Sequence, residues 1–132
     1  MRRQAPEVRW RAVLIGGLVA VMATVLVSYL ALGLSSDPLL SVATALGLAA
    51  GGATAGRLAG SFGALQGGMV GVFWVLAEAI QESFGPPSGD VLGDVALIIL
   101  ADGARIAVAA LFGWLGARTA RPASSAGRGR AR

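Results

Sequence analysis

The chain has 132 residues, of which 55% are hydrophobic and 14% are charged, and its formal net charge is +4. Soluble domains usually carry about 25% charged residues, and a chain this short cannot bury so much apolar surface away from water. The composition therefore indicates a lipid bilayer as the solvent. The sequence contains no Cys and no His, which excludes disulfides, thiolate or imidazole metal sites, and Cys or Ser–His catalysis. We accordingly expect no enzymatic activity, no metal site and no cofactor.

The first uncharged apolar run covers residues 12–34. A helix needs about 20 apolar residues to cross the hydrocarbon core of a bilayer. The run is longer than the apolar core of a signal peptide, which has roughly 7–15 residues, and no small-residue cleavage site follows it. We therefore expect it to be an uncleaved first membrane span.

Three further apolar runs follow, at residues 39–56, 64–84 and 95–117. The third span contains Glu78, and the fourth contains Asp102 and Arg105. A charge at the centre of a span costs about 2.5–3.5 kcal/mol on insertion scales, which the flanking apolar residues offset. The sequence thus predicts an all-α membrane fold in which four transmembrane helices form two hairpins.

All eleven basic residues are Arg, and every one except Arg105 lies outside the predicted spans. With four spans they all fall on one side of the membrane, whereas three spans would export the C-terminal group. Because cytoplasmic segments carry an excess of basic residues, we expect both termini in the cytoplasm. Arg in place of Lys, with abundant Ala and Gly, is typical of GC-rich bacterial genomes, so we expect a bacterial inner membrane. The candidates for setting topology and contacting lipid headgroups are Arg2, Arg3, Arg9, Arg11, Arg57, Arg118 and Arg121.

The chain is therefore expected to have three parts. Residues 1–11 form a basic N-terminal cytoplasmic segment, residues 12–117 form the transmembrane domain, and residues 118–132 form an Arg-rich cytoplasmic tail. We expect the tail to be disordered, because it is polar and low in apolar residues. No aromatic residues are interleaved with its arginines, so we expect no binding of nucleic acid. A cytoplasmic loop is expected at residues 57–63.

Glycines recur every four residues in the two central spans, and residues four apart share one face of a helix. Small residues in such a stripe let another backbone approach closely, which is how helices associate in lipid. The expected helix-packing glycines are Gly47, Gly51, Gly52 and Gly56 in the second span and Gly63, Gly67 and Gly71 in the third. Since the connecting loop is short, we expect these two stripes to pack against each other. A second use, as a contact between copies of the chain or with a membrane-protein partner, stays open.

The central hairpin carries a resemblance. The second span closes with Gly-Gly-Ala-Thr-Ala-Gly-Arg at residues 51–57, and the third opens with Gly-Ala-Leu-Gln-Gly-Gly-Met-Val-Gly at residues 63–71. This resembles a family of small uncharacterised bacterial four-span membrane proteins with a GG-x-x-AGR segment followed by a G-x-L-x-G-x-x-x-G segment. The resemblance implies the same architecture and no particular activity. A His often precedes the second glycine of the third helix in that family, but this chain has Gln66, so a proton-handling His does not carry over.

Glu78, Asp102 and Arg105 are the only charged residues in the interior of the predicted spans, since Glu82 falls at the outer end of the third. At a rise of 1.5 Å per residue they occupy one layer of the membrane, and Asp102 and Arg105 share a helix face. Because charges inside a membrane pair with one another or line a wet cavity, we expect an ion-pair cluster that joins the third and fourth helices. The alternative is a proton- or ion-binding site, since two acids and one base leave one charge over.

These features predict an integral membrane protein with no enzymatic chemistry. The first hypothesis is a packing or interaction protein with glycine-rich helix faces, which forms oligomers. The alternative is a small proton- or ion-coupled transporter or pore that uses Glu78, Asp102 and Arg105. The expected partners are the bilayer with its anionic headgroups, and either a second copy of the chain or another membrane protein.

Overall fold

The computed structural model describes residues 7–32, 37–84 and 91–120, and within these ranges the chain forms four helices and no strand. The side chains of residues 31, 37–41 and 91–94 lie outside this description. In chain order the helices are α1 (Trp10–Leu32), α2 (Asp37–Ala59), α3 (Gly63–Ser83) and α4 (Val91–Thr119). The prediction of an all-helical fold is confirmed.

The helices extend beyond the predicted spans at several ends, most clearly in α2 and α4. α2 continues to Ala59, so Arg57 lies in its last turn and not in a loop. α4 begins at Val91 and ends at Thr119, so Arg118 lies in its last turn and not in a disordered tail. Leu and Ala are good helix formers, and a cation in the last turn interacts favourably with the helix dipole. The remaining predicted basic residues, Arg2, Arg3 and Arg121, lie outside the described residues.

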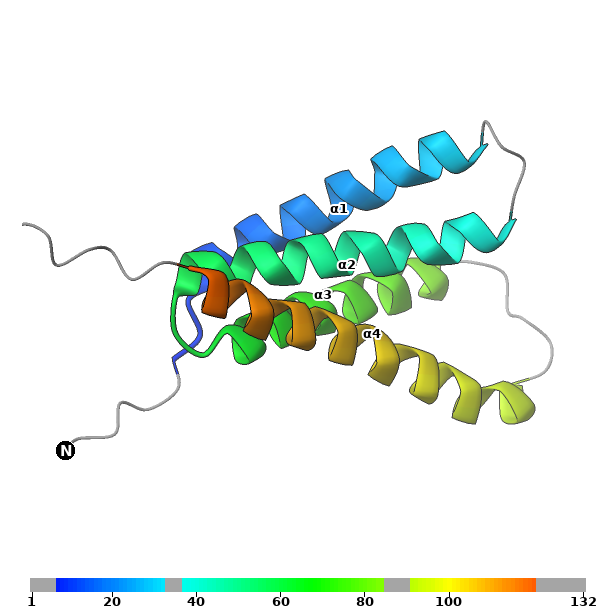
Figure 1. Ribbon diagram of the computed structural model, residues 1–132. Helices are drawn as coiled ribbons and strands as arrows, with labels where there is room; N and C mark the ends of the chain where they lie inside the picture. Colours follow the sequence, from blue (N-terminus) through cyan, green and yellow to red (C-terminus); the bar gives the residue numbers. More distant parts are fainter. Residues whose placement is uncertain (1–6, 33–36, 85–90, 121–132) are drawn as a thin grey trace, which may run out of the picture.

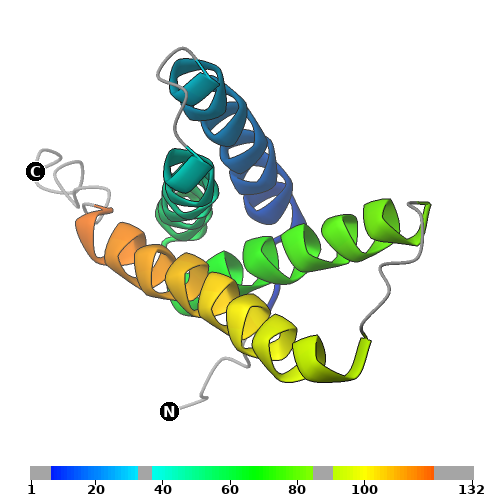
Figure 2. The same ribbon diagram turned by 90° about the vertical axis from the view of Figure 1, so that its right-hand side faces the viewer.

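The four helices run back and forth, so that the start of α1, the end of α2, the start of α3 and the end of α4 lie at one end of the molecule (Figure 1). α2 packs against each of the other three helices, whereas α1 and α4 make no contact in the described part of the chain. Toward the opposite end, α2, α3 and α4 diverge (Figure 2). We call the closed end the arginine end, because Arg9, Arg11, Arg57 and Arg118 all belong to the helix termini gathered there.

A three-residue connection, residues 60–62, joins α2 to α3 at the arginine end. Gly60 has a positive φ of 68°, and its N–H donates a hydrogen bond to the carbonyl of Gly56 at 3.0 Å. A left-handed glycine is a common way to end a helix. Phe62 also has a positive φ, 51°, and directly precedes α3. The two left-handed residues reverse the chain direction within a three-residue connection, which places α3 close beside α2.

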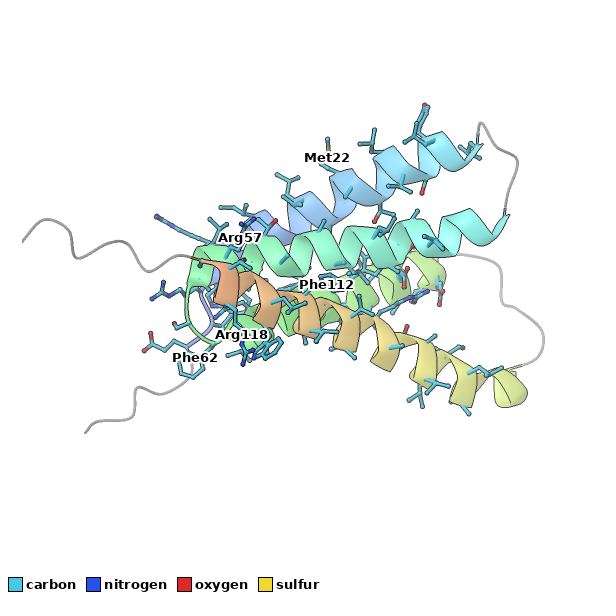
Figure 3. The ribbon with its side chains drawn as sticks, viewed as in Figure 1. Met22, Arg57, Phe62, Phe112 and Arg118 are labelled. Carbon is cyan, nitrogen blue, oxygen red and sulfur yellow. The ribbon has the colours of Figure 1, made fainter. Side chains whose placement is uncertain are left out.

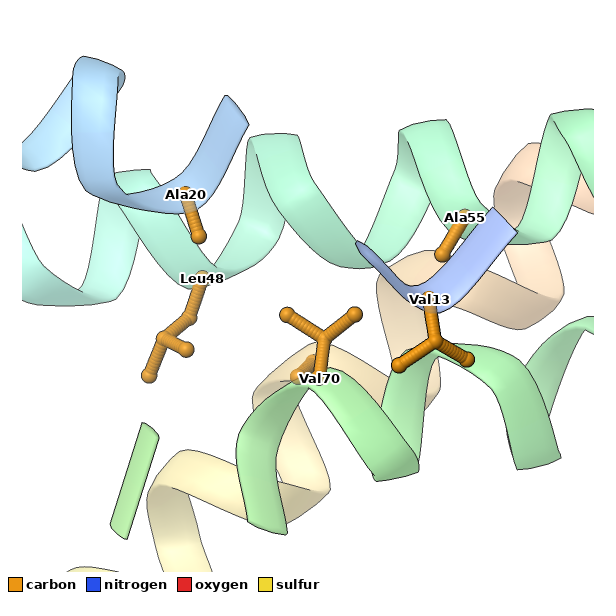
Figure 4. Packing of buried hydrophobic residues seen from close by; sticks show 6 residues of the cluster. Val13, Ala20, Leu48, Ala55 and Val70 are labelled. Atoms are coloured by element: carbon orange, nitrogen blue, oxygen red, sulfur yellow. The ribbon is translucent and has the colours of Figure 1, made fainter. Parts of the chain in front are cut away.

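The interior of the bundle is built from small side chains (Figure 4). The buried cluster consists of Val13, Ala20, Leu48, Ala55, Val70 and Ala109. The large apolar side chains lie mostly outside: Met22 is 63% exposed and points away from the other helices (Figure 3). Such a surface is a liability in water, whereas in lipid it is the normal exterior of a bundle whose small residues face inward.

Three of the described helices are long and apolar enough to cross a membrane, over Trp10–Leu30, Gly63–Ser83 and Val95–Thr119. The described residues of α2 do not meet the same test of length and composition. The fold and its exterior are those of a helical membrane protein.

Of the predicted helix-packing glycines of α2, Gly52 and Gly56 face α4, whereas Gly47 and Gly51 face α1. Gly52 lies against the backbone of Ala109, and Gly56 lies against the backbone of Gly113, so closely that a Cβ on either glycine would overlap those atoms. On its other side, α2 meets α1, where Gly51 and Gly16 lie against each other's carbonyl oxygens. α2 therefore uses its glycines for two different neighbours.

The glycine stripe of α3 faces the same part of α4. Gly63 lies against the carbonyl of Gly113, and Gly67 lies against both Ala109 and Gly113. α2 and α3 are in contact with each other, but the prediction that their glycine stripes meet is wrong. Both stripes instead enclose the small residues that recur every four positions in α4, Ala109, Gly113 and Ala117. We call this arrangement the glycine junction.

Two adjacent glycines of α3 provide a matched test of the glycine junction. In the variant Gly67→Ala the new Cβ overlaps the backbone of α4, so we expect a loss of about 1–3 kcal/mol in the free energy of unfolding. In Gly68→Ala the nearest atom to the new Cβ is the Cβ of Ala110 at 3.7 Å, an ordinary contact, so we expect no loss. Denaturant titration in detergent micelles measures both. Equal destabilisation by the two variants would contradict the junction.

Candidate functional site

The three charged residues predicted in the interior of the spans lie together. Arg105 Nη1 donates to Glu78 Oε2 at 2.5 Å and to Asp102 Oδ1 at 3.0 Å. The first pair joins α3 to α4, and the second lies within α4 at a spacing of three residues. One guanidinium nitrogen thus contacts both carboxylates and links α3 to α4. Two carboxylates and one guanidinium leave one formal negative charge over.

Trp74 is a further member of this cluster that was not predicted. Its indole N–H donates to Glu78 Oε1 at 2.8 Å. Glu78 therefore has one oxygen bound by Arg105 and the other by Trp74, which fixes the plane of the carboxylate. The two residues are four positions apart on α3 and so lie on the same helix face. That spacing is the signal in the sequence from which the contact is predictable.

The cluster is not sealed inside the protein. The exposed fractions of the side chains are 37% for Arg105, 32% for Glu78 and 27% for Asp102. A hydrocarbon environment offers no hydrogen-bond partner to such groups. The exposed parts of the cluster consequently require either water or a second protein surface.

Arg105 lines two hollows, one on each side of α4. The first has a volume of about 510 Å³, lies between α2 and α4, and is mostly apolar, with Thr44 as its other polar residue. The second has a volume of about 210 Å³ and lies between α3 and α4, where Glu78, Glu82 and Asp102 line it together with Arg105. Of these two hollows, only the one between α3 and α4 is lined by acidic side chains.

The hollow between α3 and α4 is closed on the side of the arginine end. There Gly71 lies against Ile106, one turn before Gly67 lies against Ala109. On the other side, Glu82 continues the line of acidic groups toward the end of α3, where the helices diverge (Figure 2). The arrangement is a recess between α3 and α4 that reaches from Glu82 to Arg105.

Charged side chains that meet between membrane helices commonly pair with one another and bind ions or protons. Among the described residues, no group of three or more His, Cys, Asp or Glu side chains is placed to hold a metal ion.

Gln66, at the arginine end, is a completely buried polar residue. Its side-chain oxygen accepts from the backbone N–H of Arg9 at 3.0 Å, and its Nε2 donates to the backbone carbonyl of Glu7 at 2.8 Å. The amide thereby satisfies one donor and one acceptor of the segment that leads into α1. Gln66 was noted in the sequence only as a departure from a family pattern, whereas in the structure it fastens the N-terminal segment to α3.

The basic residues at the arginine end have surroundings different from those of Arg105. Arg118 lies over the ring of Trp114, with its guanidinium carbon 3.6 Å from the ring centroid. Arg57 and Arg118 both lie at the closed end of the bundle (Figure 3). In the described part of the chain, only Arg105 forms ion pairs with carboxylates. The charge distribution is therefore asymmetric along the bundle, with uncompensated basic residues at one end.

The fold is helical with three helices long and apolar enough to span a membrane, and it brings charged residues of α3 and α4 together. Comparisons with protein-family models, with curated proteins and with solved structures give no match. The resemblance of the central hairpin to small four-span bacterial proteins accordingly stays a prediction from residues 51–71.

Proposed function

We propose that the chain crosses the bacterial inner membrane four times, with both termini in the cytoplasm, and that it belongs with the small four-span proteins its central hairpin resembles. The gathering of Arg9, Arg11, Arg57 and Arg118 at one end of the bundle supports this orientation, because basic residues are retained on the cytoplasmic side. α2 is 23 residues long and packs against all three other helices. It therefore spans the same layer as its neighbours.

Single-cysteine labelling tests the topology without background, since the chain has no Cys. We expect a membrane-impermeant maleimide to label Ser88→Cys in intact spheroplasts. Ser61→Cys, in the α2–α3 connection, and Ser125→Cys, in the tail, become labelled only after lysis. Labelling of Ser125→Cys from outside intact spheroplasts would overturn the proposed orientation.

Within this topology the protein acts as a non-enzymatic packing or interaction protein. The observation that carries this proposal is the exposure of every residue from 95 to 101, which we call the exposed α4 segment. Ile99 and Leu100 are 67% and 69% exposed. The segment runs directly into the charge cluster at Asp102 and Arg105. Lipid covers the apolar residues well, but it cannot satisfy the exposed guanidinium beside them.

A second copy of the chain satisfies both requirements at once. It covers the exposed α4 segment by side-chain packing and provides polar atoms to the cluster. The glycines named in the sequence are largely occupied within the chain, whereas Gly103, beside Asp102, has no atom within 4 Å of the position of a Cβ. A partner backbone therefore has room to approach the cluster at this point.

Disulfide cross-linking tests the contact between copies. We expect Leu100→Cys, on the exposed α4 segment, to form a covalent dimer in native membranes under mild oxidation. Leu18→Cys is the matched control, because Leu18 is 64% exposed but lies on α1, and it is expected to remain monomeric. Cross-linking of neither variant, or of both to the same extent, would contradict the proposed contact.

A second candidate function is a small carrier for protons or ions. The observation in its favour is the recess between α3 and α4, in which Glu82, Glu78 and Asp102 lead from the diverging end to Arg105. A charged recess closed on one side has the form that a carrier needs to bind from one side at a time. The glycine junction is then the closed side.

Flux in proteoliposomes distinguishes the carrier from the interaction protein. For a carrier, a pH gradient drives uptake that a trapped dye reports, and Glu78→Gln or Asp102→Asn abolishes it in protein that still folds. Glu7→Gln is the control, because Glu7 lies near the arginine end and outside the recess. Absence of proton or ion flux with the unsubstituted protein would remove this candidate.

A further inference from the structure

A third hollow lies at the arginine end, on the outside of the α1–α2 pair. It has a volume of about 430 Å³ and is lined by Arg9, Trp10, Arg11, Ala12, Ile15 and Leu58. Two of these residues are cationic and four are apolar. The apolar wall continues along both helices, since Ile15 is 47% and Leu58 is 52% exposed.

The position of the two cationic residues is fixed from inside the protein. Gln66 holds the backbone of Glu7 and Arg9 through its two hydrogen bonds, and the Arg9 carbonyl accepts from the N–H groups of Ala12 and Val13, at 2.9 and 3.1 Å. The Trp10 ring meets the edge of Phe73 on α3 with the centroids 6.0 Å apart. Arg9, which directly precedes α1, and Arg11, in its first turn, are therefore held in place by α3.

Neither cation of the hollow has an acidic partner among the described residues. The ion pairs among the described residues all involve Arg105, which lies on α4. A pair of guanidinium groups without carboxylates attracts a phosphate, to which Arg presents a fork of N–H donors. The combination of two such groups with an apolar wall and a tryptophan matches a molecule with an anionic head and a hydrocarbon chain.

We propose that this hollow is a binding site for one anionic phospholipid of the cytoplasmic leaflet. The phosphate binds between Arg9 and Arg11, and an acyl chain lies along Ile15 and Leu58. The inference rests on the proposed membrane topology, which places the arginine end at the cytoplasmic surface. It goes beyond a general attraction of basic residues to the membrane, because it assigns the lipid to Arg9 and Arg11 and not to Arg57 and Arg118.

Quenching of Trp10 by brominated lipids tests the site. Trp74→Phe and Trp114→Phe leave Trp10 as the remaining indole of the full chain, which is reconstituted in phosphatidylcholine vesicles. We expect brominated phosphatidylglycerol to be preferred to brominated phosphatidylcholine at this indole by about fivefold, corresponding to a contribution of about 1 kcal/mol. Arg9→Gln with Arg11→Gln brings the preference close to equality.

The double variant Arg57→Gln with Arg118→Gln is the matched control, because it removes the same charge from the same end and leaves the hollow intact. We expect it to keep the preference, and Arg9→Lys with Arg11→Lys to keep most of it in a protein with unchanged charge. An equal loss in the Arg57 and Arg118 variant would show a general surface attraction and overturn the site.

Soluble glycerol phosphate distinguishes a lipid from a free anion. We expect millimolar glycerol phosphate to leave the quenching unchanged, since it lacks the acyl chain, and full displacement by it would overturn the assignment to a phospholipid. Equal quenching by the two lipids in a protein whose topology is as proposed would refute the lipid site alone. Labelling of the tail from outside would instead refute the topology on which the site depends.

Discussion

The close approach of α4 to both α2 and α3 is the constraint on which the rest of the structure depends. In lipid there is little hydrophobic gain from bringing helices together, so their association relies on packing at short range. Here the backbone at Ala109 and Gly113 lies against glycines from two helices at once. A residue larger than glycine at the facing positions would overlap the α4 backbone. The buried core consists mostly of alanine and valine for the same reason, since small side chains let the helices lie close together.

The glycine junction also places the charge cluster. Arg105 lies one helical turn before Ala109 on α4, so it emerges where the three helices begin to diverge. At that level the helices are close enough for Arg105 to reach Glu78 across the gap, yet too far apart to bury either side chain. The cluster is therefore partly open because of its position along the bundle. The same geometry leaves the exposed α4 segment without a partner in its own chain.

Much of this organisation is predictable from the sequence, and the remainder has clear physical reasons for escaping prediction. The apolar runs define the helices, and the spacing of Asp102 and Arg105 places them on one face. The partner of each glycine stripe is not predictable from the local sequence, because any two small helix faces pack together equally well. The small residues of α4 that face the stripes also do not stand out among the other alanines of that helix. The structural role of Gln66 was not predictable, since its hydrogen-bond partners are backbone groups far away in the chain.

The left-handed connection at Gly60 and Phe62 has a mechanical consequence for the molecule. It ties α2 to α3 by three residues at the end where both helices lie against the backbone of Gly113 in α4, so the two helices have little freedom to separate there. The contacts at this end are made by glycines and backbone atoms, with no flexible side chain to fill a wider gap. The helices therefore cannot separate there without losing the contacts. A small change in the angle between the helices at this end therefore becomes a large change in their separation at the opposite end, where they already diverge (Figure 2).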